Sequence, residues 1–295
     1  MTNVVASILA RLKNIAKKNG LVYNDVLRRY ATERILKRIE LSPYSSQCIL
    51  KGGTLFVLWR EGFDYRPTMD IDLEFRGEAS TDGLVRMFRE IALMPGGESD
   101  GLRIDPKTIQ ARDIREDDPY GGIRVTMVAY VGHVRQPVQF DVGIGDAVTP
   151  RAKKEAFPVL LDMETPRILV YPRETIVAEK FETIVKRGMA NSRMKDYYDL
   201  LVLRDDKQLD WEVAAKALAR TFTRRGTKIP SEVPEGLSDA FADESSKQIQ
   251  WASFLRKNRL AVGERSLLDV VRELREFFLK LVAPLKVAAG ADHSV

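Results

Sequence analysis

The sequence feature that most restricts the fold is a pair of aspartates in an alternating apolar stretch, placed shortly after a glycine turn. Residues 51–75 read KGGTLFVLWREGFDYRPTMDIDLEF. Because successive side chains of a strand point to opposite faces, Asp70 and Asp72 would share one face and Ile71 and Leu73 the other. The two aspartate Cα atoms would lie roughly 7 Å apart, and carboxylates this close repel each other unless a cation or a base lies between them.

A divalent cation is the natural partner for this pair. Mg²⁺ prefers oxygen ligands and keeps room for waters and substrate phosphates. Surface carboxylates on an amphipathic strand are the simpler alternative, but the preceding turn favours the cation. Gly52 and Gly53 let the backbone approach a ligand closely, and Thr54 would be the N-cap of a helix over 54–60 whose free N–H groups can hold a phosphate. The sequence lacks the GxxxxGK[ST] spacing of a P-loop.

A third carboxylate follows in the segment VQFDVGIGD, residues 138–146. Strand alternation places Asp141 on the polar face of this segment. Asp141 would complete a metal site if its strand lies beside residues 70–75. Asp146 is the alternative, although its position after a glycine is more typical of a turn.

The hydrophobic pattern divides the chain into two parts. Helical spacing marks residues 1–40, strand alternation marks later segments, and the chain is mainly helical from about Pro166 onward. Between residues 77 and 120 the sequence predicts one helix and loops. The predicted fold class is therefore α+β, with a mixed α/β domain and N-terminal helices over 1–160 and a mainly helical domain over 161–295. The predicted elements after the first helices are a short strand or turn at 47–53, strands at 70–75, 122–132 and 137–145, and a helix at 83–93.

Charge and cysteine content narrow the class of protein. The net charge of +5 over 295 residues is compatible with a polyanionic partner. Two basic stretches, LRRYATERILKR at 27–38 and RTFTRRGTK at 220–228, could supply a nucleic-acid surface or be solvated helix faces. No apolar run reaches the roughly 18–20 residues that a membrane-spanning helix needs. The single cysteine, Cys48, rules out a disulfide within the chain, fits a cytoplasmic location and reads as a small buried hydrophobe.

One lysine interrupts an apolar helix face in the segment RETIVAEKFETIVKR. Lys180 lies four residues from both Ile176 and Ile184, so its ammonium must extend to solvent, pair with a carboxylate or bind an anion. In NSRMKDYYDLL, Asp196 follows Arg193 by three residues. An ion pair within one helix, worth about 0.2–0.5 kcal/mol, is the simplest role for Asp196.

Taken together, these segments resemble a known family. KGGT at 51–54 and RPTMDIDL at 66–73 are similar to the first motif of the AbiEii/AbiGii toxin family of nucleotidyltransferases, which includes the MenT-type toxins and belongs to the DNA polymerase β-like superfamily. Four later segments resemble further family blocks, and the likeness runs from roughly residue 25 to residue 205. These later segments are YGGIRVTMVAYVG, FDVGIGDAVTP, YPRETIVAEKFETIVKRG and NSRMKDYYDLLVL.

The resemblance implies a polymerase β-like nucleotidyltransferase core with a mixed sheet, an NTP substrate, and Mg²⁺ or Mn²⁺ as cofactor. It also implies that a meeting of Lys180 and Asp196 across two helices brings the C-terminal domain to the active-site cleft. The implied catalytic residues are Asp70, Asp72, Lys180 and Asp196. The implied metal ligands are Asp70, Asp72 and Asp141, with Asp146 as the alternative third carboxylate. The implied nucleotide-binding residues are Gly52, Gly53, Thr54, Arg66, Thr68 and Lys180.

The resemblance further implies the toxin of a toxin–antitoxin or phage-defence system, acting beside a separate antitoxin protein. The implied acceptor of the nucleotide is the 3′ end of a tRNA, and no membrane is involved. Two alternatives stay open at this point. The acceptor could be a protein or a small molecule, or the chain could be a non-catalytic nucleic-acid-binding protein on the same fold. The sequence does not specify which NTP is used.

Overall fold

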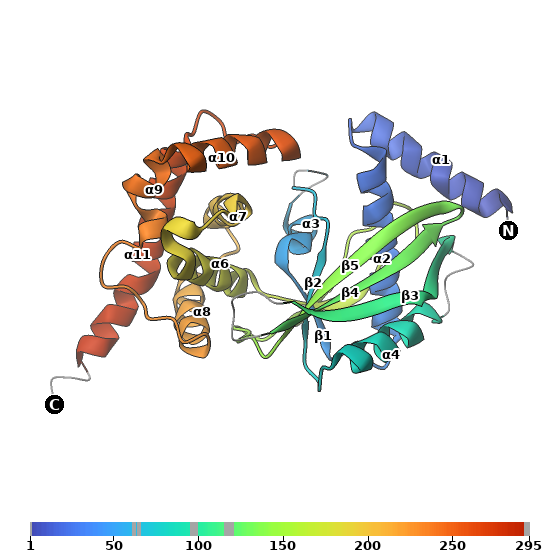
Figure 1. The fold of residues 1–295 in the computed structure, drawn as a ribbon, viewed down its shortest axis with the longest axis horizontal. Coiled ribbons are helices and arrows are strands. Elements are labelled where there is room, and N and C mark those ends of the chain that lie inside the picture. The colour runs from blue at the N-terminus through green and yellow to red at the C-terminus, as the bar shows by residue number, and fades with distance from the viewer. Residues whose placement is uncertain (1, 61–62, 64–65, 95–99, 115–120, 292–295) are drawn as a thin grey trace. The chain divides into compact units, whose positions relative to one another are not determined.

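The computed structural model describes residues 2–60, 63, 66–94, 100–114 and 121–291. The chain forms two compact units, each made of two segments (Figure 1). Unit 1 contains Met1–Gly145 and Lys153–Val170, and unit 2 contains Asp146–Ala152 and Tyr171–Val295. The predicted domain limits, 1–160 and 161–295, differ from the limits of these interleaved units and remain a prediction.

The described residues of unit 1 form one seven-stranded mixed sheet in the order β3-β4-β5-β2-β1-β7-β6. β2 is parallel to β5 and β1 is parallel to β7, while the other neighbours are antiparallel. This arrangement confirms the predicted α+β class. The strands are β1 (Cys48–Lys51), β2 (Ile71–Phe75), β3 (Leu102–Ile114), β4 (Gly122–Val131), β5 (Val134–Ile144), β6 (Lys153–Ala156) and β7 (Arg167–Val170). The helices are α1 (Thr2–Lys18), α2 (Tyr23–Leu41), η1 (Gly52–Leu55), α3 (Phe56–Trp59) and α4 (Thr81–Ala92).

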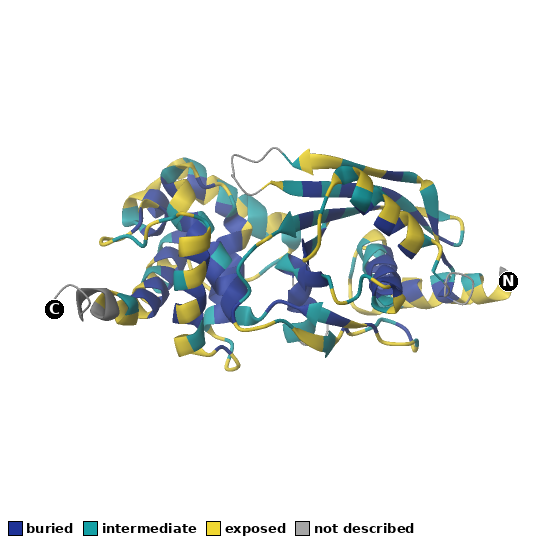
Figure 2. Ribbon diagram, turned by 90° about the horizontal axis from the view of Figure 1, so that it is seen from below, coloured by how far each residue is buried: buried dark blue, intermediate teal, exposed yellow. Residues whose placement is uncertain are grey.

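One face of the sheet is apolar and covered by α2 and α4. Burial alternates strictly along β4, where every second residue is buried, and Figure 2 shows this alternation as dark blue and lighter bands along the strands. Phe88 of α4 packs on Phe140 of β5 with ring centroids 4.7 Å apart. The opposite face of β4 and β5 carries polar and half-buried or exposed side chains, and it is the face to which Asp72 and Asp141 belong.

Most predicted elements of unit 1 are confirmed, and three strands were missed. The predicted mixture of one helix and loops over 77–120 is wrong because β3 occupies Leu102–Ile114. The register of β3 against β4 shifts between Asp105 and Gln110, so a bulge interrupts the alternation that would have indicated a strand. The region after residue 145 also contains β6 and β7, which have four residues each. The glycine-rich residues 95–99 lie outside the described residues.

Unit 2 is helical throughout its described elements. Three phenylalanines from two helices meet at its centre, since Phe181 lies 5.1 Å from Phe277 and 5.3 Å from Phe278 between ring centroids. No helix among the described residues of either unit is long and apolar enough to span a bilayer. The elements are α6 (Arg173–Arg187), η2 (Gly188–Ala190), α7 (Met194–Arg204), α8 (Trp211–Arg224), η3 (Glu235–Leu237), α9 (Asp239–Asp243), α10 (Ser245–Asn258) and α11 (Leu267–Ala291).

Candidate active site

The paired aspartates lie at the start of a central strand of unit 1. Asp72 is the second residue of β2, and Asp70 comes one residue before the strand begins. Both side chains are half-buried, while Ile71 and Leu73 on the other face are buried at 4% and 1% exposure. The alternation of polar and apolar positions therefore folds as predicted, with Asp70 in a bend and not within the strand.

A third carboxylate on this face is neutralised by a lysine. Glu74 is 1% exposed, and its Oε2 lies 3.1 Å from Nζ of Lys51 on the neighbouring β1. Gly143 lies opposite Glu74 on β5, and a Cβ at this position would overlap the Lys51 ammonium. Glu74 is therefore paired within the protein and is not one of the predicted metal ligands.

The glycine turn is packed against Asp72. Gly52 has φ +72°, a conformation that L side chains rarely adopt, and a Cβ there would overlap the Asp72 carboxylate. A Cβ on Gly53 would overlap the guanidinium of Arg66 and lie 2.7 Å from Cγ2 of Thr68. Both glycines are therefore required for the backbone to reach these side chains.

Thr54 joins the same cluster, although not in the predicted way. Its Oγ1 lies 3.4 Å from Oγ1 of Thr68, and its side chain is buried. The prediction that Thr54 is a helix N-cap is wrong, because a 3₁₀ turn begins at Gly52, so the N-cap position belongs to Lys51. The α-helix that follows is only Phe56–Trp59, which is shorter than the predicted helix over 54–60. Five predicted nucleotide-binding residues thus lie together beside Asp72: Gly52, Gly53, Thr54, Arg66 and Thr68.

Asp141 lies beside Asp72 but is held by an arginine. The two aspartates are register partners on the parallel strands β5 and β2. Nε and Nη2 of Arg124 each donate to a different oxygen of Asp141 at 2.8 Å, and Gln139 donates to the Asp141 Oδ1 at 3.2 Å. The alternative, Asp146, belongs to unit 2, where it accepts from Arg225 at 3.1 Å.

The donor set fits a magnesium ion that shares its ligands with a substrate. No group of three or more histidine, cysteine, aspartate or glutamate side chains among the described residues is arranged to hold a metal alone. Mg²⁺ is commonly bound through one or two carboxylates with substrate phosphates and waters completing the octahedron. Asp70 and Asp72, half-buried beside a glycine turn, meet that requirement.

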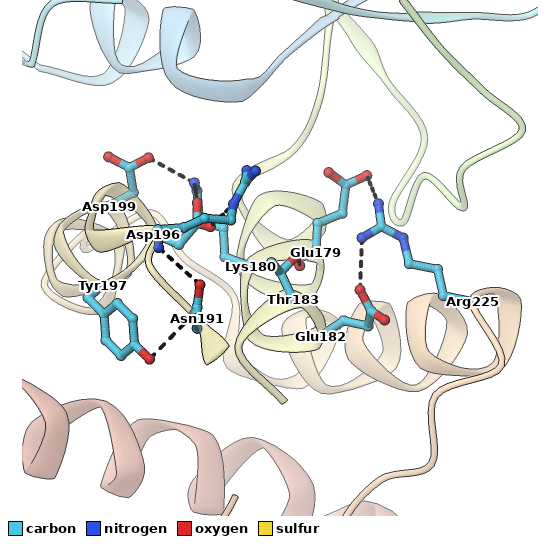
Figure 3. A network of polar contacts seen from close by, with 10 residues as sticks. Glu179, Lys180, Glu182, Thr183, Asn191, Asp196, Tyr197, Asp199 and Arg225 are labelled. Carbon is cyan, nitrogen blue, oxygen red and sulfur yellow. Dashed lines mark hydrogen bonds and ion pairs between the residues drawn. The ribbon is translucent and has the colours of Figure 1, made fainter. Parts of the chain in front are cut away.

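In unit 2, Lys180 and Asp196 meet across α6 and α7, as the sequence predicts. The Lys180 ammonium lies 2.7 Å from Oδ1 of Asp196 and 2.8 Å from Oδ2 of Asp199, and Arg193 Nε lies 2.7 Å from Asp196 Oδ2 (Figure 3). Burial alone would raise the pKa of Asp196, but Lys180 and Arg193 together hold that pKa well below its usual range. The cluster is 9% exposed or less at Lys180, Asp196 and Asp199.

A second buried charge network in unit 2 was not predicted. Arg225 lies 3.4 Å from Glu179 and 2.9 Å from Glu182 (Figure 3). It also lies 3.1 Å from Asp146. Burial would lower the pKa of Arg225, but the three carboxylates raise it above its ordinary value. The partners lie 43 to 79 residues from Arg225 in sequence, so no local pattern could indicate this pairing.

Comparison with known proteins decides the family. The family model for the nucleotidyl transferase AbiEii toxin of type IV toxin–antitoxin systems matches residues 34–273. The chain belongs to the AbiEii family. It is a nucleotidyltransferase, and the family implies an NTP substrate and a cognate antitoxin.

Solved structures agree with this AbiEii fold. JHP933 from Helicobacter pylori is 13% identical, with a TM-score of 0.51 over 93% of this chain and 98% of its own. A candidate nucleotidyltransferase from H. pylori is also 13% identical, with a TM-score of 0.51 over 91% of this chain and 99% of its own. A search of the curated proteins found no match to this sequence. At this identity the likeness concerns the fold alone.

Three arginines of the two basic stretches of this AbiEii protein, Arg34, Arg38 and Arg225, are held by partners within the fold and do not contribute to a nucleic-acid surface. Arg34 and Arg38 of α2 are 3% and 2% exposed. Arg38 donates to both oxygens of Asp100, and Arg34 donates to the Glu164 carbonyl. Arg225 of the second stretch is held by carboxylates as described above. These cations stabilise the fold, because a buried guanidinium requires such partners.

Proposed function

We propose that this AbiEii protein transfers a nucleotide from an NTP to the 3′ end of a tRNA in a magnesium-dependent reaction. The observation that carries the proposal is the contact between the glycine turn and Asp72, which sets backbone that can approach a phosphate against a carboxylate that can ligate a cation. Family membership supports the enzymatic reading over the non-catalytic alternative. The positive net charge is compatible with an RNA acceptor.

Asp70 and Asp72 would hold the magnesium, which when bound neutralises charge on the triphosphate and on the attacking and leaving oxygens. The Gly52–Gly53 backbone and the buried Arg66 guanidinium would orient the triphosphate. The acceptor hydroxyl oxygen forms a bond to the α-phosphorus, and the bond to the pyrophosphate oxygen breaks. A carboxylate of the site, Asp70 in our proposal, accepts the hydroxyl proton.

Asp141 is the proposed third carboxylate, because it is the register partner of Asp72. For it to ligate a metal, the Arg124 fork would have to release one of its oxygens. Lys180 and Asp196 stay predicted catalytic residues. Their buried pairing supports a positioning role, in which the ammonium orders α6 and α7 and does not itself meet substrate.

The test is transfer of label from each α-³²P-labelled NTP, with magnesium, into total tRNA and into cell protein. Label in tRNA that is lost in Asp70→Ala supports the proposal and identifies the nucleotide. Label in protein, lost in the same variant, would keep the chemistry and replace the acceptor. No label in either pool with any NTP would contradict both the acceptor and the assigned site.

A further inference from the structure

A hollow with a volume of about 310 Å³ lies beside Asp70. β2 pairs with β5 only over Phe140–Ile144, so residues 134–139 of β5 extend past the start of β2. The hollow is formed beside this extension, with α2, β4 and the bulge of β3 completing its walls. Its polar lining consists of Arg28, Asp70, Thr108, Thr126, Arg135 and Gln139.

The hollow contains two positive side chains that can bind an anion and, next to them, a carboxylate that can accept a proton from a hydroxyl. Arg28 and Arg135 bring two guanidinium groups, and Asp70 is the one carboxylate among the described residues of the lining. Arg28 also donates to Asp25 at 2.8 Å, which fixes its side chain along α2. Arg135 is exposed. Arginine forks bind phosphate oxygens in pairs, which gives orientation as well as affinity.

The same face of the sheet continues the positive charge away from Asp70. Arg103 and Arg112 of β3 are exposed, and they are register partners of Tyr130 and Arg124 on β4. The guanidinium carbon of Arg103 lies 4.3 Å from the centroid of the Tyr130 ring. Among the residues that the structure describes, the carboxylates on this part of the face include Asp105 and Asp141, of which Asp141 is held by Arg124. Arginines and an aromatic ring on one surface are typical of sites for single-stranded nucleic acid.

We propose that the hollow binds the last nucleotide of the acceptor RNA strand, with Arg28 and Arg135 on its 5′ phosphate. This inference rests on the proposed function, because it names where that acceptor lies. Thr126 and Gln139, which are cross-strand neighbours, contact the ribose or the base. The terminal hydroxyl then lies at Asp70, and the preceding nucleotides pass Arg135 and Tyr130 towards Arg103, which are register neighbours across β5, β4 and β3. A protein acceptor would present no phosphate to these guanidinium groups.

The experiment compares Arg135→Ala with Arg167→Ala. Both residues are exposed arginines of the same sheet, but Arg167 lies on β7 and does not line the hollow. The probe is a short 5′-fluorescein-labelled single-stranded RNA ending in CCA, measured by anisotropy without NTP over a range of salt concentrations. Loss of one phosphate contact is expected to lower the slope of log K against log salt by about 0.7. Thr126→Asp, which adds a like charge inside the hollow, is the second variant and should weaken RNA binding as well.

Steady-state transfer separates this inference from the proposed function. If the wild type labels RNA, Arg135→Ala should raise the KM for RNA roughly tenfold and leave the KM for NTP unchanged, while Arg167→Ala behaves as the wild type. If RNA is labelled but all variants have equal KM values for RNA and equal salt slopes, the hollow does not bind the acceptor RNA. The proposed function would then still hold. Label only in protein, or in no acceptor, would contradict the proposed acceptor and this inference with it.

Discussion

Two clusters of carboxylates in this AbiEii protein use charge in opposite ways. In unit 1, Asp70 and Asp72 are half-buried on the accessible face of a sheet, beside the glycine pair Gly52–Gly53. In unit 2, Asp196 and Asp199 are 1% and 0% exposed, and a lysine lies within 2.8 Å of both. The first arrangement places two carboxylates where our proposal puts the metal and the triphosphate. In the second arrangement the protein itself supplies the neutralising cation, so these carboxylates contribute to the stability of the folded state.

The largest expected effect is on transfer activity when Asp72 is removed. Asp72→Ala should lower kcat/KM by at least roughly 1000-fold, because the charge that holds the cation is lost. Far-ultraviolet circular dichroism should stay unchanged, since the side chain is half-buried and lies on the accessible face. Asp82→Asn, on the exposed side of α4, is the control and should keep full activity. If Asp72→Ala is folded and transfers nucleotide normally, Asp72 does not hold the cation, and the two clusters do not differ in the way described.

The second effect is on the stability of unit 2. Lys180→Met leaves two buried carboxylates with one fewer cation, which should lower the free energy of unfolding by about 3 kcal/mol. Urea denaturation measures this, and Lys216→Met, on the exposed face of α8, is the control.

The pH dependence of that loss identifies its cause. In the wild type the pKa of Asp196 lies below its usual value, so its contribution is present above the unfolded pKa and disappears only when pH falls through the lower, folded value. Without Lys180 the pKa values of the buried carboxylates rise, and protonation relieves them. The deficit of Lys180→Met should therefore shrink on acidification from pH 7 to pH 5. A deficit that is independent of pH would indicate lost packing and not an uncompensated charge.

The third effect tests the contact between the turn and Asp72. Gly52→Ala introduces a side chain at φ +72° that overlaps the Asp72 carboxylate, and transfer should fall roughly 100-fold, as expected when a reacting group is displaced by about 1 Å. Gly20→Ala is a matched control, since Gly20 has φ +63° and nothing within 4 Å of the added Cβ. It should lose about 1 kcal/mol of stability from backbone strain and no activity. Equal activities of the two variants would mean that the overlap does not matter.

The smallest effect concerns a buried carboxyl in unit 1 that is less well compensated than Asp196. Burial raises the pKa of Glu33 to about 7, and Arg29 at 2.8 Å only partly opposes this. A raised carboxyl pKa favours the protonated form in the folded state, so stability should fall as pH rises from about 4.5 to about 7. Glu33→Gln should remove roughly 2 kcal/mol of that fall, measured as urea midpoints across this range. A wild-type profile that does not fall with pH would show that Arg29 compensates Glu33 fully.

The parts of the site that the sequence predicts are those coded within a few residues. The glycine pair, the alternation around Ile71 and the lysine in an apolar stripe each depend on local geometry, and each is found as expected. Cys48 is likewise buried, and burial raises the pKa of its thiol to about 12. The Arg124 fork on Asp141 and the Lys51–Glu74 pair depend instead on which strands become neighbours. β2 and β5 are parallel strands separated by two others in sequence, and no local pattern specifies that register.

Strand β3 was missed for a different reason. Asp105, Pro106 and Lys107 stand in its middle, and proline and charged residues argue against a strand when they are read alone. The bulge accommodates them: Thr108 accepts a hydrogen bond from the Val128 backbone N–H at 2.9 Å, which replaces regular pairing there.

The polar edge strand β6, with the sequence KKEA, carries lysines of the kind that protect sheet edges from aggregation.

The division of the chain into interleaved segments has a practical consequence. The polypeptide passes from one unit to the other at three places, after Gly145, after Ala152 and after Val170. No single cut at one of these positions therefore separates the chain into two whole units. Stopping at Gly145 removes β6 and β7 and exposes the outer edge of β1, whereas starting at Tyr171 removes Asp146 from the Arg225 network. Expressing either unit without residues of the other would require a gene that joins two segments which are discontinuous in the natural sequence.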